Sequence, residues 1–485
     1  MTLTRRQWLA GAASLAGAAG LGGVARGLEA LKHERPRRIV IAGAGLSGLA
    51  AATVLVDHGH EVTVLEARDR PGGRVFTAYE PFKNGQFAEL GAGRVPNVHT
   101  LTLGYVDRFG LPLEPFQPDK GGEDVLRFRG KTYRYPRGKS FDASKLPLEL
   151  TADEKKRGAR NVLQSKMQPL LLSLRDIASP DYPPESLRAN DIDVRALCKR
   201  EGMSLDVFAG QAIGVFEPKT DRASTLGRMR ILPMLLSARM MWRIPGGNSR
   251  LPRAIADALG ERIHYRSPVV AVKQTATGVT VVAVEDGRER AFQADYMIWA
   301  APLPPLKRVA FDPPLSPGKQ RATEEAYFSA VTRVALQVSN RFWESSGLSG
   351  YANSDDPLEL WHTTFDKPGP EGILVGYFKH EGAIELAATP REERAAEGIR
   401  RIARLLPGVE AHVIASKVKV WAEDPWAGGA YLQFLPGQLY DLKPHFARPE
   451  GRVHFAGDHT SHLPGWMQGA LASGHRAAGE IMSLG

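Results

Sequence analysis

The first strongly patterned stretch of the chain reads as a strand, a helix and a second strand. Four consecutive apolar residues, Ile39 to Ala42, predict a buried strand. The Ala-, Leu- and Val-rich segment from Leu49 to Val56 predicts a helix, and the run from Val62 to Leu65 predicts another strand. This order is typical of an α/β domain built on a parallel sheet.

Helical periodicity dominates the middle of the chain. Apolar positions recur at helical spacing over residues 154–177, 194–200 and 228–241. Pro169 and Pro233 fall inside the first and last of these segments, where we expect a kink or a break. We interpret residues 119–239 as an inserted, mostly helical lobe, the kind of insertion that often shapes a substrate pocket.

Short β-branched runs return after residue 240. The predicted strands are residues 263–265, 269–272, 279–284, 295–301, 331–338 and 373–378, and residues 391–406 form an amphipathic helix. A last strand at 453–456, followed by a final helix from about Gly465, is placed so that it can rejoin the first sheet. We therefore assign residues 36–118, 240–302 and 446–485 to one α/β domain and residues 303–445 to a second domain with a mixed sheet.

Composition excludes several classes of function but does not identify one. The 485-residue chain is 43% hydrophobic and 24% charged, which is ordinary for a globular protein, and it is too long for one core. Its net charge of +10 is spread along the chain without long Lys/Arg runs, so we expect no nucleic-acid partner. Cys198 is the only cysteine, which excludes an internal disulfide and a multi-cysteine zinc site, and no metal site is predicted.

The N-terminus has the pattern of an export signal. Arg5 and Arg6 precede a weakly apolar Ala/Gly/Leu stretch from Ala10 to Val24, which is too short and too rich in glycine for a stable membrane span. This pattern resembles a twin-arginine signal, and the alternative is a basic tail. We expect residues 1–31 to engage the twin-arginine (Tat) export machinery and the protein to be periplasmic or secreted, a route that moves proteins already folded around a cofactor.

A glycine-rich turn joins the first strand to the first helix. Gly43, Gly45 and Gly48 are spaced so that the backbone turns tightly and approaches a pyrophosphate, which then binds the N–H groups at the helix start. Leu46 and Ser47 lie in the same turn. Glu66 ends the second strand, eighteen residues past Gly48, where a carboxylate accepts hydrogen bonds from a ribose diol. These features together predict an adenine-dinucleotide site.

Further motifs resemble those of the flavin-containing amine oxidases, and of the L-amino acid oxidases most of all. The resemblance covers most of the chain after residue 36 and is weakest between about residues 120 and 240. It rests on the dinucleotide turn and on the segments Gly72-Gly73-Arg74, Gly91-Ala92-Gly93-Arg94-Val95-Pro96, Phe455-Ala456-Gly457-Asp458-His459-Thr460 and Gly465-Trp466-Met467-Gln468-Gly469-Ala470.

The resemblance implies a fold and a cofactor. The fold is α/β, with a Rossmann-like FAD-binding domain of the GR2 type, an inserted helical lobe and a mixed-sheet substrate domain. The cofactor is FAD, bound without a covalent link, because Ala430 occupies the position where some monoamine oxidases carry the tethering cysteine. Residues implied to contact FAD are Gly43, Gly45, Leu46, Ser47, Gly48, Glu66, Ala67, Arg68, Gly73, Arg74, Gly91, Ala92, Gly93, Arg94, Val270, Gly457, Asp458, Trp466 and Met467.

The resemblance also assigns substrate contacts. Arg94 matches an arginine that clamps the substrate carboxylate, although it could instead hold flavin or a neighbouring acid. Tyr377 matches a tyrosine that assists the same carboxylate, or is a core aromatic of its strand. Tyr431 and Trp466 match two aromatic walls that flank the substrate amine. Without the resemblance, we would interpret both side chains as part of the hydrophobic core.

One position departs from the family pattern. The family usually places a lysine near the reactive nitrogen of the flavin, and this sequence has Arg333 there. Arginine stays cationic, whereas a desolvated lysine titrates. The departure implies a shifted alignment, a different reaction with dioxygen, or another electron acceptor.

The resemblance predicts oxidative deamination of an L-amino acid to a 2-oxo acid, ammonia and hydrogen peroxide, by hydride transfer to flavin with dioxygen as acceptor. The alternatives are an oxidase of an amine without a carboxylate (a monoamine, polyamine or alkaloid), a flavin dehydrogenase with a non-oxygen acceptor, and an exported FAD-binding protein without catalysis. The side-chain preference stays open, and for the oligomeric state a homodimer is one expectation.

Overall fold

The computed structural model describes residues 36–116, 121–174, 183–209, 222–356, 358–365 and 367–484. The segment predicted to be an export signal lies outside these residues, so the export signal stays a prediction. In the described part of the chain, no helix is both long and apolar enough to span a bilayer. The same part holds no group of three or more His, Cys, Asp or Glu side chains arranged for a metal.

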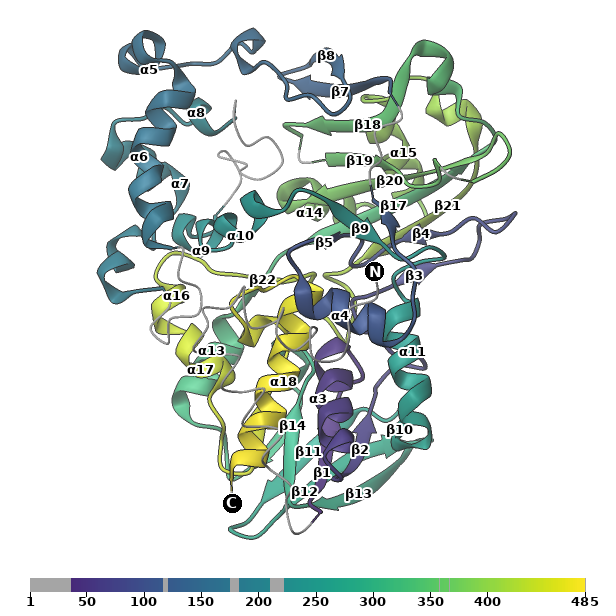
Figure 1. Ribbon diagram of the computed structural model, residues 1–485, viewed down its shortest axis with the longest axis vertical. Coiled ribbons are helices and arrows are strands. Elements are labelled where there is room, and N and C mark those ends of the chain that lie inside the picture. Colours follow the sequence, from purple (N-terminus) through teal and green to yellow (C-terminus); the bar gives the residue numbers. More distant parts are fainter. Residues whose placement is uncertain are drawn as a thin grey trace.

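A five-stranded parallel sheet forms the centre of one lobe, in the lower half of Figure 1. Its strand order is β10 (Ile263–His264), β2 (Glu61–Leu65), β1 (Arg38–Ala42), β14 (Tyr296–Trp299) and β23 (Val453–Phe455). Ile41 pairs with Val64 on one side and with Ile298 on the other. The last strand of the chain thus rejoins the first sheet. Because the sheet is parallel, β1 and β23, which are more than 400 residues apart in sequence, have their carboxyl ends on the same side of the lobe.

The two faces of this sheet bury different partners because side chains alternate along β1. Ile39 and Ile41 pack with four helices, and Val40 and Ala42 belong to the core on the opposite side. The helices are α3 (Leu46–Asp57), α4 (Thr100–Arg108), α11 (Arg250–Leu259) and α18 (Met467–Ser483). The opposite side is covered by a four-stranded sheet of β13 (Arg288–Ala294), β12 (Val279–Glu285), β11 (Val269–Gln274) and β15 (Ala310–Asp312).

Two of these helices lie unusually close together. A Cβ on Gly474 of α18 would come within 2.2 Å of the Ser47 carbonyl oxygen of α3. The glycine therefore lets α18 rest directly on the first turn of α3, as the adjacent yellow and purple helices of Figure 1 show.

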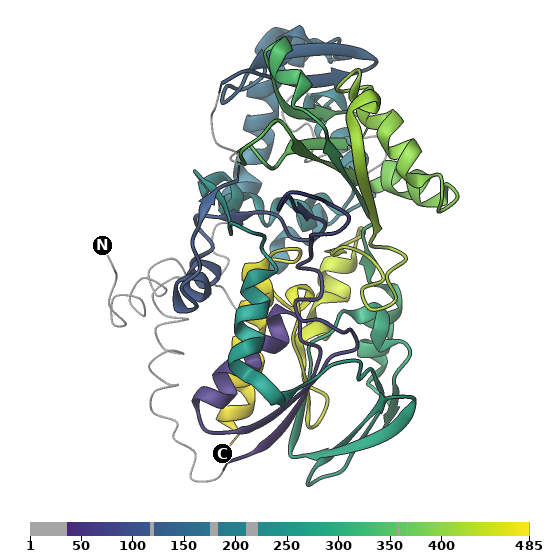
Figure 2. The same ribbon diagram turned by 90° about the vertical axis from the view of Figure 1, so that its right-hand side faces the viewer.

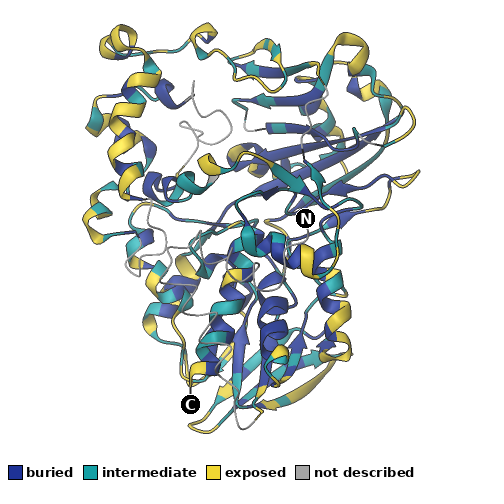
Figure 3. Cartoon of the chain, viewed as in Figure 1, coloured by how far each residue is buried: buried dark blue, intermediate teal, exposed yellow. Residues whose placement is uncertain are grey.

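A seven-stranded sheet forms the second lobe, in the upper half of Figures 1 and 2. Its order is β21 (Val413–Val420), β17 (Val331–Val338), β20 (Gly372–Lys379), β19 (Leu358–His362), β18 (Leu348–Ser354), β7 (Glu123–Phe128) and β8 (Lys131–Pro136). The helices α14 (His380–Ala388) and α15 (Arg394–Ala403) cover one face. The other face buries aromatic residues of the central strands, among them Trp361 and Tyr377. The dark blue central strands in Figure 3 show that this sheet is a buried core.

The inserted lobe contains six helices in the described residues: α5 (Ala152–Arg157), α6 (Ala159–Ser173), α7 (Val194–Glu201), α8 (Asp206–Ala209), α9 (Thr225–Met229) and α10 (Leu232–Ser237). Pro169 lies inside α6 without ending it, and the break comes instead at Gly158, whose φ of 86° belongs to the left-handed region. The predicted helix over 228–241 is divided into α9, α10 and a strand, β9 (Met241–Arg243).

One hairpin and two pairs of helices pack with a different lobe from the one that the sequence suggests. The hairpin β7–β8 falls inside residues 119–239, yet β7 pairs with β18 and extends the seven-stranded sheet. Conversely, α12 (Leu303–Leu306), α13 (Pro317–Glu325), α16 (Gln438–Asp441) and α17 (Lys443–Ala447) share their core with the parallel-sheet lobe, although residues 303–445 were assigned to the second domain.

Candidate active site

A cavity of about 600 Å³ lies between the two lobes. One end is lined by the turn after β1 and the end of β2, and the other by side chains of β17, β19 and β20. Pockets that hold small molecules commonly have this size and lie between domains, and in parallel sheets they lie beyond the carboxyl ends of the strands.

The glycine turn at the first end leaves room for a ligand. Gly43 has φ of 108° and a Cβ on Gly48 would collide with the Gly43 carbonyl oxygen at 1.9 Å, so both positions require glycine. A Cβ on Gly45, in contrast, would meet no atom within 4 Å. The open space in front of Gly45 is where the phosphates of a dinucleotide would approach the start of α3.

Glu66 is held in place at the end of β2. Its side chain is buried, and its two oxygens accept hydrogen bonds from the backbone N–H groups of Ala44 (2.7 Å) and Arg68 (2.9 Å). Burial raises the pKa of Glu66, and the two N–H groups act against that rise. The Arg68 side chain points to Asp424, with nitrogen–oxygen distances of 3.1 and 2.5 Å.

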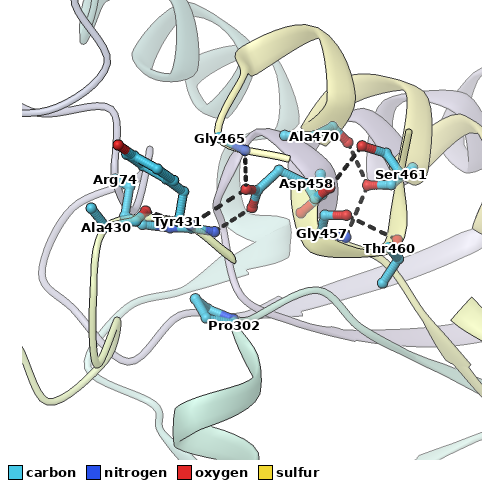
Figure 4. Close-up of polar contacts among 12 residues, drawn as sticks. Arg74, Pro302, Ala430, Tyr431, Gly457, Asp458, Thr460, Ser461, Gly465 and Ala470 are labelled. Atoms are coloured by element: carbon cyan, nitrogen blue, oxygen red, sulfur yellow. Dashed lines mark hydrogen bonds and ion pairs between the residues drawn. The ribbon is translucent and has the colours of Figure 1, made fainter. Parts of the chain in front are cut away.

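Arg74 lines the cavity, and its side chain connects its own loop to two other segments (Figure 4). Its guanidinium forms an ion pair with Asp458 and donates to the Ala430 carbonyl oxygen at 2.7 Å. Asp458 also accepts from the Gly465 N–H at 2.7 Å. Burial alone would raise the pKa of Asp458, but Arg74 holds it below the usual value. This arrangement fixes the loop that leads into α18.

The residues implied to contact FAD come together around this cavity. All of them line it except Gly48, which lies under the turn, and Gly457, which follows β23 and donates its N–H to Ser473 Oγ at 2.8 Å. Val270 of β11 and Ala67 are part of the wall. The open space at Gly45, the carboxylate of Glu66 and the cavity that continues from them past the start of α18 fit a dinucleotide with a flavin ring. Ala430 also lines the cavity and has no group that could form a covalent tether.

At the other end, three side chains form one row across the seven-stranded sheet. Arg333 of β17 is in register with Tyr377 of β20, and Tyr377 is in register with Glu359 of β19. Side chains in register on neighbouring strands share one face. The next positions on that face, Trp361 and Lys379, also line the cavity.

Arg94 meets this row from the loop after β4 (Ala88–Glu89). Its guanidinium carbon lies 4.8 Å from the ring centre of Trp361, and Nη1 is 3.7 Å from Glu359 Oε2. A distance of 3.7 Å is an ion pair but not a hydrogen bond, so Glu359 orients Arg94 without using its donors. About a third of the Arg94 side chain is exposed, on the cavity side.

Glu359 is the acidic residue that lines this end of the cavity in the described part of the chain. It accepts from Lys379 Nζ at 2.8 Å and from the Trp361 indole N–H at 3.0 Å. Burial would raise the pKa of Glu359, but the charges of Lys379 and Arg94 lower it to about 2. The side chain is therefore a carboxylate at all physiological pH values.

Arg333 is buried in an aromatic setting. Its guanidinium carbon lies 3.7 Å from the ring centre of Tyr377 and 4.3 Å from that of Trp361. Among the described residues, Nη2 donates to the Gly91 carbonyl oxygen at 3.5 Å, and Nε and Nη1 have no hydrogen-bond partner. Burial lowers the pKa of Arg333 to about 10, so the group stays cationic at neutral pH.

Aromatic side chains complete the walls. The hydroxyls of Tyr377 and Tyr431 are 3.3 Å apart, and a Cβ on Gly465 would come within 3.1 Å of the Tyr431 ring. Trp466 precedes α18 and packs edge-on against His99, whose pKa burial lowers to about 3. The structure thus brings Arg94, Tyr377, Tyr431, Trp466 and Arg333 to one cavity, and their individual functions stay predictions.

Sequence reasoning missed several residues of this site. Glu359 and Trp361 lie in a strand that was not predicted, and Lys379 follows directly on a run predicted as buried strand. The signal was the alternation Leu358-Glu359-Leu360-Trp361, in which a charged side chain recurs with an aromatic on one face. Asp424, which holds Arg68 and also pairs with Lys419, was missed as well.

Comparisons with known proteins identify the family of this chain. The sequence model of the flavin containing amine oxidoreductase family matches residues 46–482. The L-amino-acid oxidase of Pseudechis australis is 28% identical over 464 residues, covering 93% of this chain and 87% of that protein. An L-amino-acid oxidase of Bothrops moojeni is 28% identical over 460 residues, covering 92% and 90%.

The fold is also that of solved amine oxidases. The structure of wild-type putrescine oxidase bound to putrescine matches with a TM-score of 0.75 and 27% identity, covering 93% of this chain and 99% of that one. The family match spans nearly all described residues of both lobes, and the cavity fits the cofactor on which the family depends. The chain therefore belongs to the flavin-containing amine oxidoreductases and is an enzyme that uses FAD to oxidise amines.

Proposed function

We propose that the protein oxidatively deaminates an L-amino acid, with dioxygen as electron acceptor. The substrate loses two electrons and two protons to become an imine, and water hydrolyses the imine to a 2-oxo acid and ammonia. Dioxygen takes the electrons and protons and leaves as hydrogen peroxide. FAD, when bound, supplies the two-electron chemistry.

The position of Arg94 supports this proposal most directly. Its guanidinium faces the cavity beside the aromatic walls, and Glu359 and Trp361 fix its orientation without taking its hydrogen-bond donors. A planar guanidinium gives a carboxylate two parallel hydrogen bonds, which determines the face of Cα presented to the reaction. Tyr377 lies in the same wall, where its hydroxyl can assist.

The aromatic residues exclude water and hold the amine. Tyr431 and Trp466 line the cavity on the side of α18, and the ring faces of such residues attract a cationic or partly charged amine. Burial raises the pKa of Tyr431, so its hydroxyl stays neutral and is available as a hydrogen-bond donor. The chemical step requires the neutral amine, so the rate is expected to rise with pH until the substrate amine is deprotonated.

A second candidate is an amine without a carboxylate. It is favoured by the putrescine oxidase similarity and by Glu359, a mostly buried carboxylate in the wall that attracts cations. Lys379 already pairs with Glu359 at 2.8 Å, however, which leaves less negative charge for a second ammonium group.

Bleaching of the flavin separates the two candidates. The holoenzyme is mixed without oxygen with L- and D-amino acids and with simple amines, and the loss of the yellow flavin absorbance is followed. For an L-amino acid oxidase, Arg94→Ala should raise KM for L-amino acids by about 10- to 150-fold, the value of a charge-assisted hydrogen bond. Unchanged KM in Arg94→Ala, with bleaching by carboxylate-free amines, would establish the second candidate instead.

A further inference from the structure

Arg333 of β17 is a buried cation in the cavity wall with hydrogen-bond donors that the described residues do not use. It is 6% exposed, and it lines the cavity. Nη2 donates to the Gly91 carbonyl oxygen at 3.5 Å, which is long for a hydrogen bond, and Nε and Nη1 have no hydrogen-bond partner among the described residues. Since a guanidinium carries its N–H groups in one rigid plane, Arg333 can donate further hydrogen bonds to a ligand in the cavity.

Arg333 and Arg94 approach the same aromatic side chain. The guanidinium carbon of Arg333 lies 4.3 Å from the ring centre of Trp361, and that of Arg94 lies 4.8 Å from it. Gly91, which accepts from Arg333, belongs to the loop that carries Arg94. Two guanidiniums held against one ring are near enough for a single small ligand to contact both.

The charges of the two arginines favour an anion between them. Arg94 lies 3.7 Å from Glu359, and Arg333 has no such acidic partner within the described ranges. Burial lowers the pKa of Arg333 to about 10, and the like charge of Arg94 acts in the same direction. An anion that contacts both side chains would relieve this repulsion and compensate Arg333 for the hydration that it loses on burial.

A carboxylate fits this pair of cations in charge and in geometry. Its two oxygens offer about four acceptor sites. One guanidinium takes one site on each oxygen when it binds with two parallel hydrogen bonds. The remaining sites point away from that guanidinium and can accept from a second one.

We propose that Arg333 is a second binding residue for the α-carboxylate of the substrate, which lies between Arg94 and Arg333. The inference rests on the proposed function, since it adds a contact to the carboxylate that Arg94 holds. Arg333 belongs to a central strand and Arg94 to a loop, so the strand residue adds rigidity to the placement of Cα. Arg333 takes no part in bond breaking.

Carboxylate probes without an amino group measure this contact without turnover. The probes are 3-phenylpropanoate and butanoate, one aromatic and one aliphatic, each paired with the amide of the same shape. Their affinity for the holoenzyme is measured by calorimetry. Arg333→Met should weaken carboxylate binding by about tenfold or more, the value of a charge-assisted hydrogen bond, and should leave amide binding nearly unchanged. Arg333→Gln, which keeps a polar but uncharged group, should give the same pattern.

Arg253→Met is the matched control. It makes the same replacement at an exposed position of α11, outside the cavity wall, and should leave the affinity for every probe within about twofold of the wild-type value. A second control is the affinity of FAD for protein stripped of it. A residue that binds only the substrate should leave this affinity unchanged, so Arg333→Met and the wild type are expected to bind FAD equally well.

The outcomes separate the inference from the proposed function. If Arg94→Ala weakens the binding of the carboxylates and Arg333→Met does not, the second contact is absent while the amino acid oxidase stands. The inference is equally wrong if Arg333→Met weakens the binding of FAD instead, because Arg333 would then be a cofactor contact. If the wild type binds the carboxylates no more tightly than the amides, and only amines without a carboxylate bleach the flavin, the proposed function fails and the inference fails with it.

Discussion

Arg333 illustrates how a single substitution changes the chemistry available to this fold. The side chain packs against Tyr377 and Trp361, and in the described part of the chain it has no acidic hydrogen-bond partner and two unpaired donors. A lysine in this environment would lose its proton easily, since burial disfavours a compact, strongly hydrated charge. The guanidinium keeps its charge, because burial lowers the pKa of Arg333 only to about 10.

The pH profile should report this difference. In the wild type, kcat/KM is expected to rise up to pH 9 as the substrate amine loses its proton, without a descending limb, because Arg333 stays cationic over this range. Arg333→Lys should add a descending limb, since a buried lysine loses its charge as the pH rises through a pKa lowered well below its usual 10.4 or so. The measurement is kcat/KM from pH 6 to 9 for the same substrate.

A third variant completes the test of Arg333. Arg333→Met has no titrating group at this position, so its activity should be lower but its profile should lack the new limb. A descending limb of the same midpoint in Arg333→Met and in Arg333→Lys would assign that titration to another group.

At the scale of elements, the sequence was most informative where one local rule decided the structure. Residues 331–338 are predicted as a strand and form β17 with the same limits. Valine and threonine, which favour strands, take four of its eight positions, and all eight are buried. The glycine turn was equally clear, since Gly43 and Gly48 are required by their own backbone geometry. The rejoining of β23 to the parallel sheet followed from the rules of α/β connection.

Elements that form only through pairing with distant parts of the chain are harder to predict from the sequence. The strand β13 has an exposed, mostly polar sequence and exists because β12 pairs with it along seven positions. The hairpin β7–β8 joins the seven-stranded sheet through β18, more than 200 residues away. Glu359 and Lys379 were missed for the same reason: each is an ordinary strand residue until cross-strand register brings them together.

Contact between α18 and α3 gives a prediction at this scale. Gly474→Ala places a methyl group 2.2 Å from the Ser47 carbonyl oxygen, which forces the two helices apart, and overpacking of this kind costs about 1–3 kcal/mol or more. The Gly474→Ala holoenzyme is therefore expected to unfold at a lower urea concentration and to bind FAD less tightly, since Met467 of α18 and Ser47 of α3 both line the cavity.

Gly479 provides the matched control on the same helix. A Cβ there meets no atom within 4 Å, and alanine is the better helix former, so Gly479→Ala should stabilise the protein by about 0.5–1 kcal/mol. Equal unfolding midpoints for the two variants would show that the close approach of α18 to α3 is not required.

At the scale of the whole molecule, the two lobes meet through charged contacts around the cavity. Asp424 follows the second-lobe strand β21 and pairs with Arg68 of the first lobe and with Lys419 of its own lobe. Arg74 of the first lobe donates to Ala430 at 2.7 Å. Each lobe has its own hydrophobic core. FAD in the cavity between the lobes is therefore expected to contact both of them and to add to the Arg68–Asp424 and Arg74–Ala430 contacts.

Removal of FAD should therefore lower the stability of the whole chain. A ligand that binds only the folded state, at a free concentration 100 times Kd, adds about 2.7 kcal/mol, which corresponds to roughly 3 °C in Tm for a chain of this length. Protein stripped of FAD and then titrated with it should show Tm rising with the logarithm of FAD concentration.

Gly45→Ala distinguishes stabilisation by FAD bound at the glycine turn from stabilisation by FAD bound elsewhere, because its methyl group enters open space and leaves the fold intact. Its FAD-free Tm should match that of the FAD-free wild type within about 1 °C, while its rise with FAD should be smaller, since the methyl group occupies the approach of the phosphates to the start of α3. A Gly45→Ala protein that responds to FAD as the wild type does would mean that the dinucleotide lies elsewhere in the cavity.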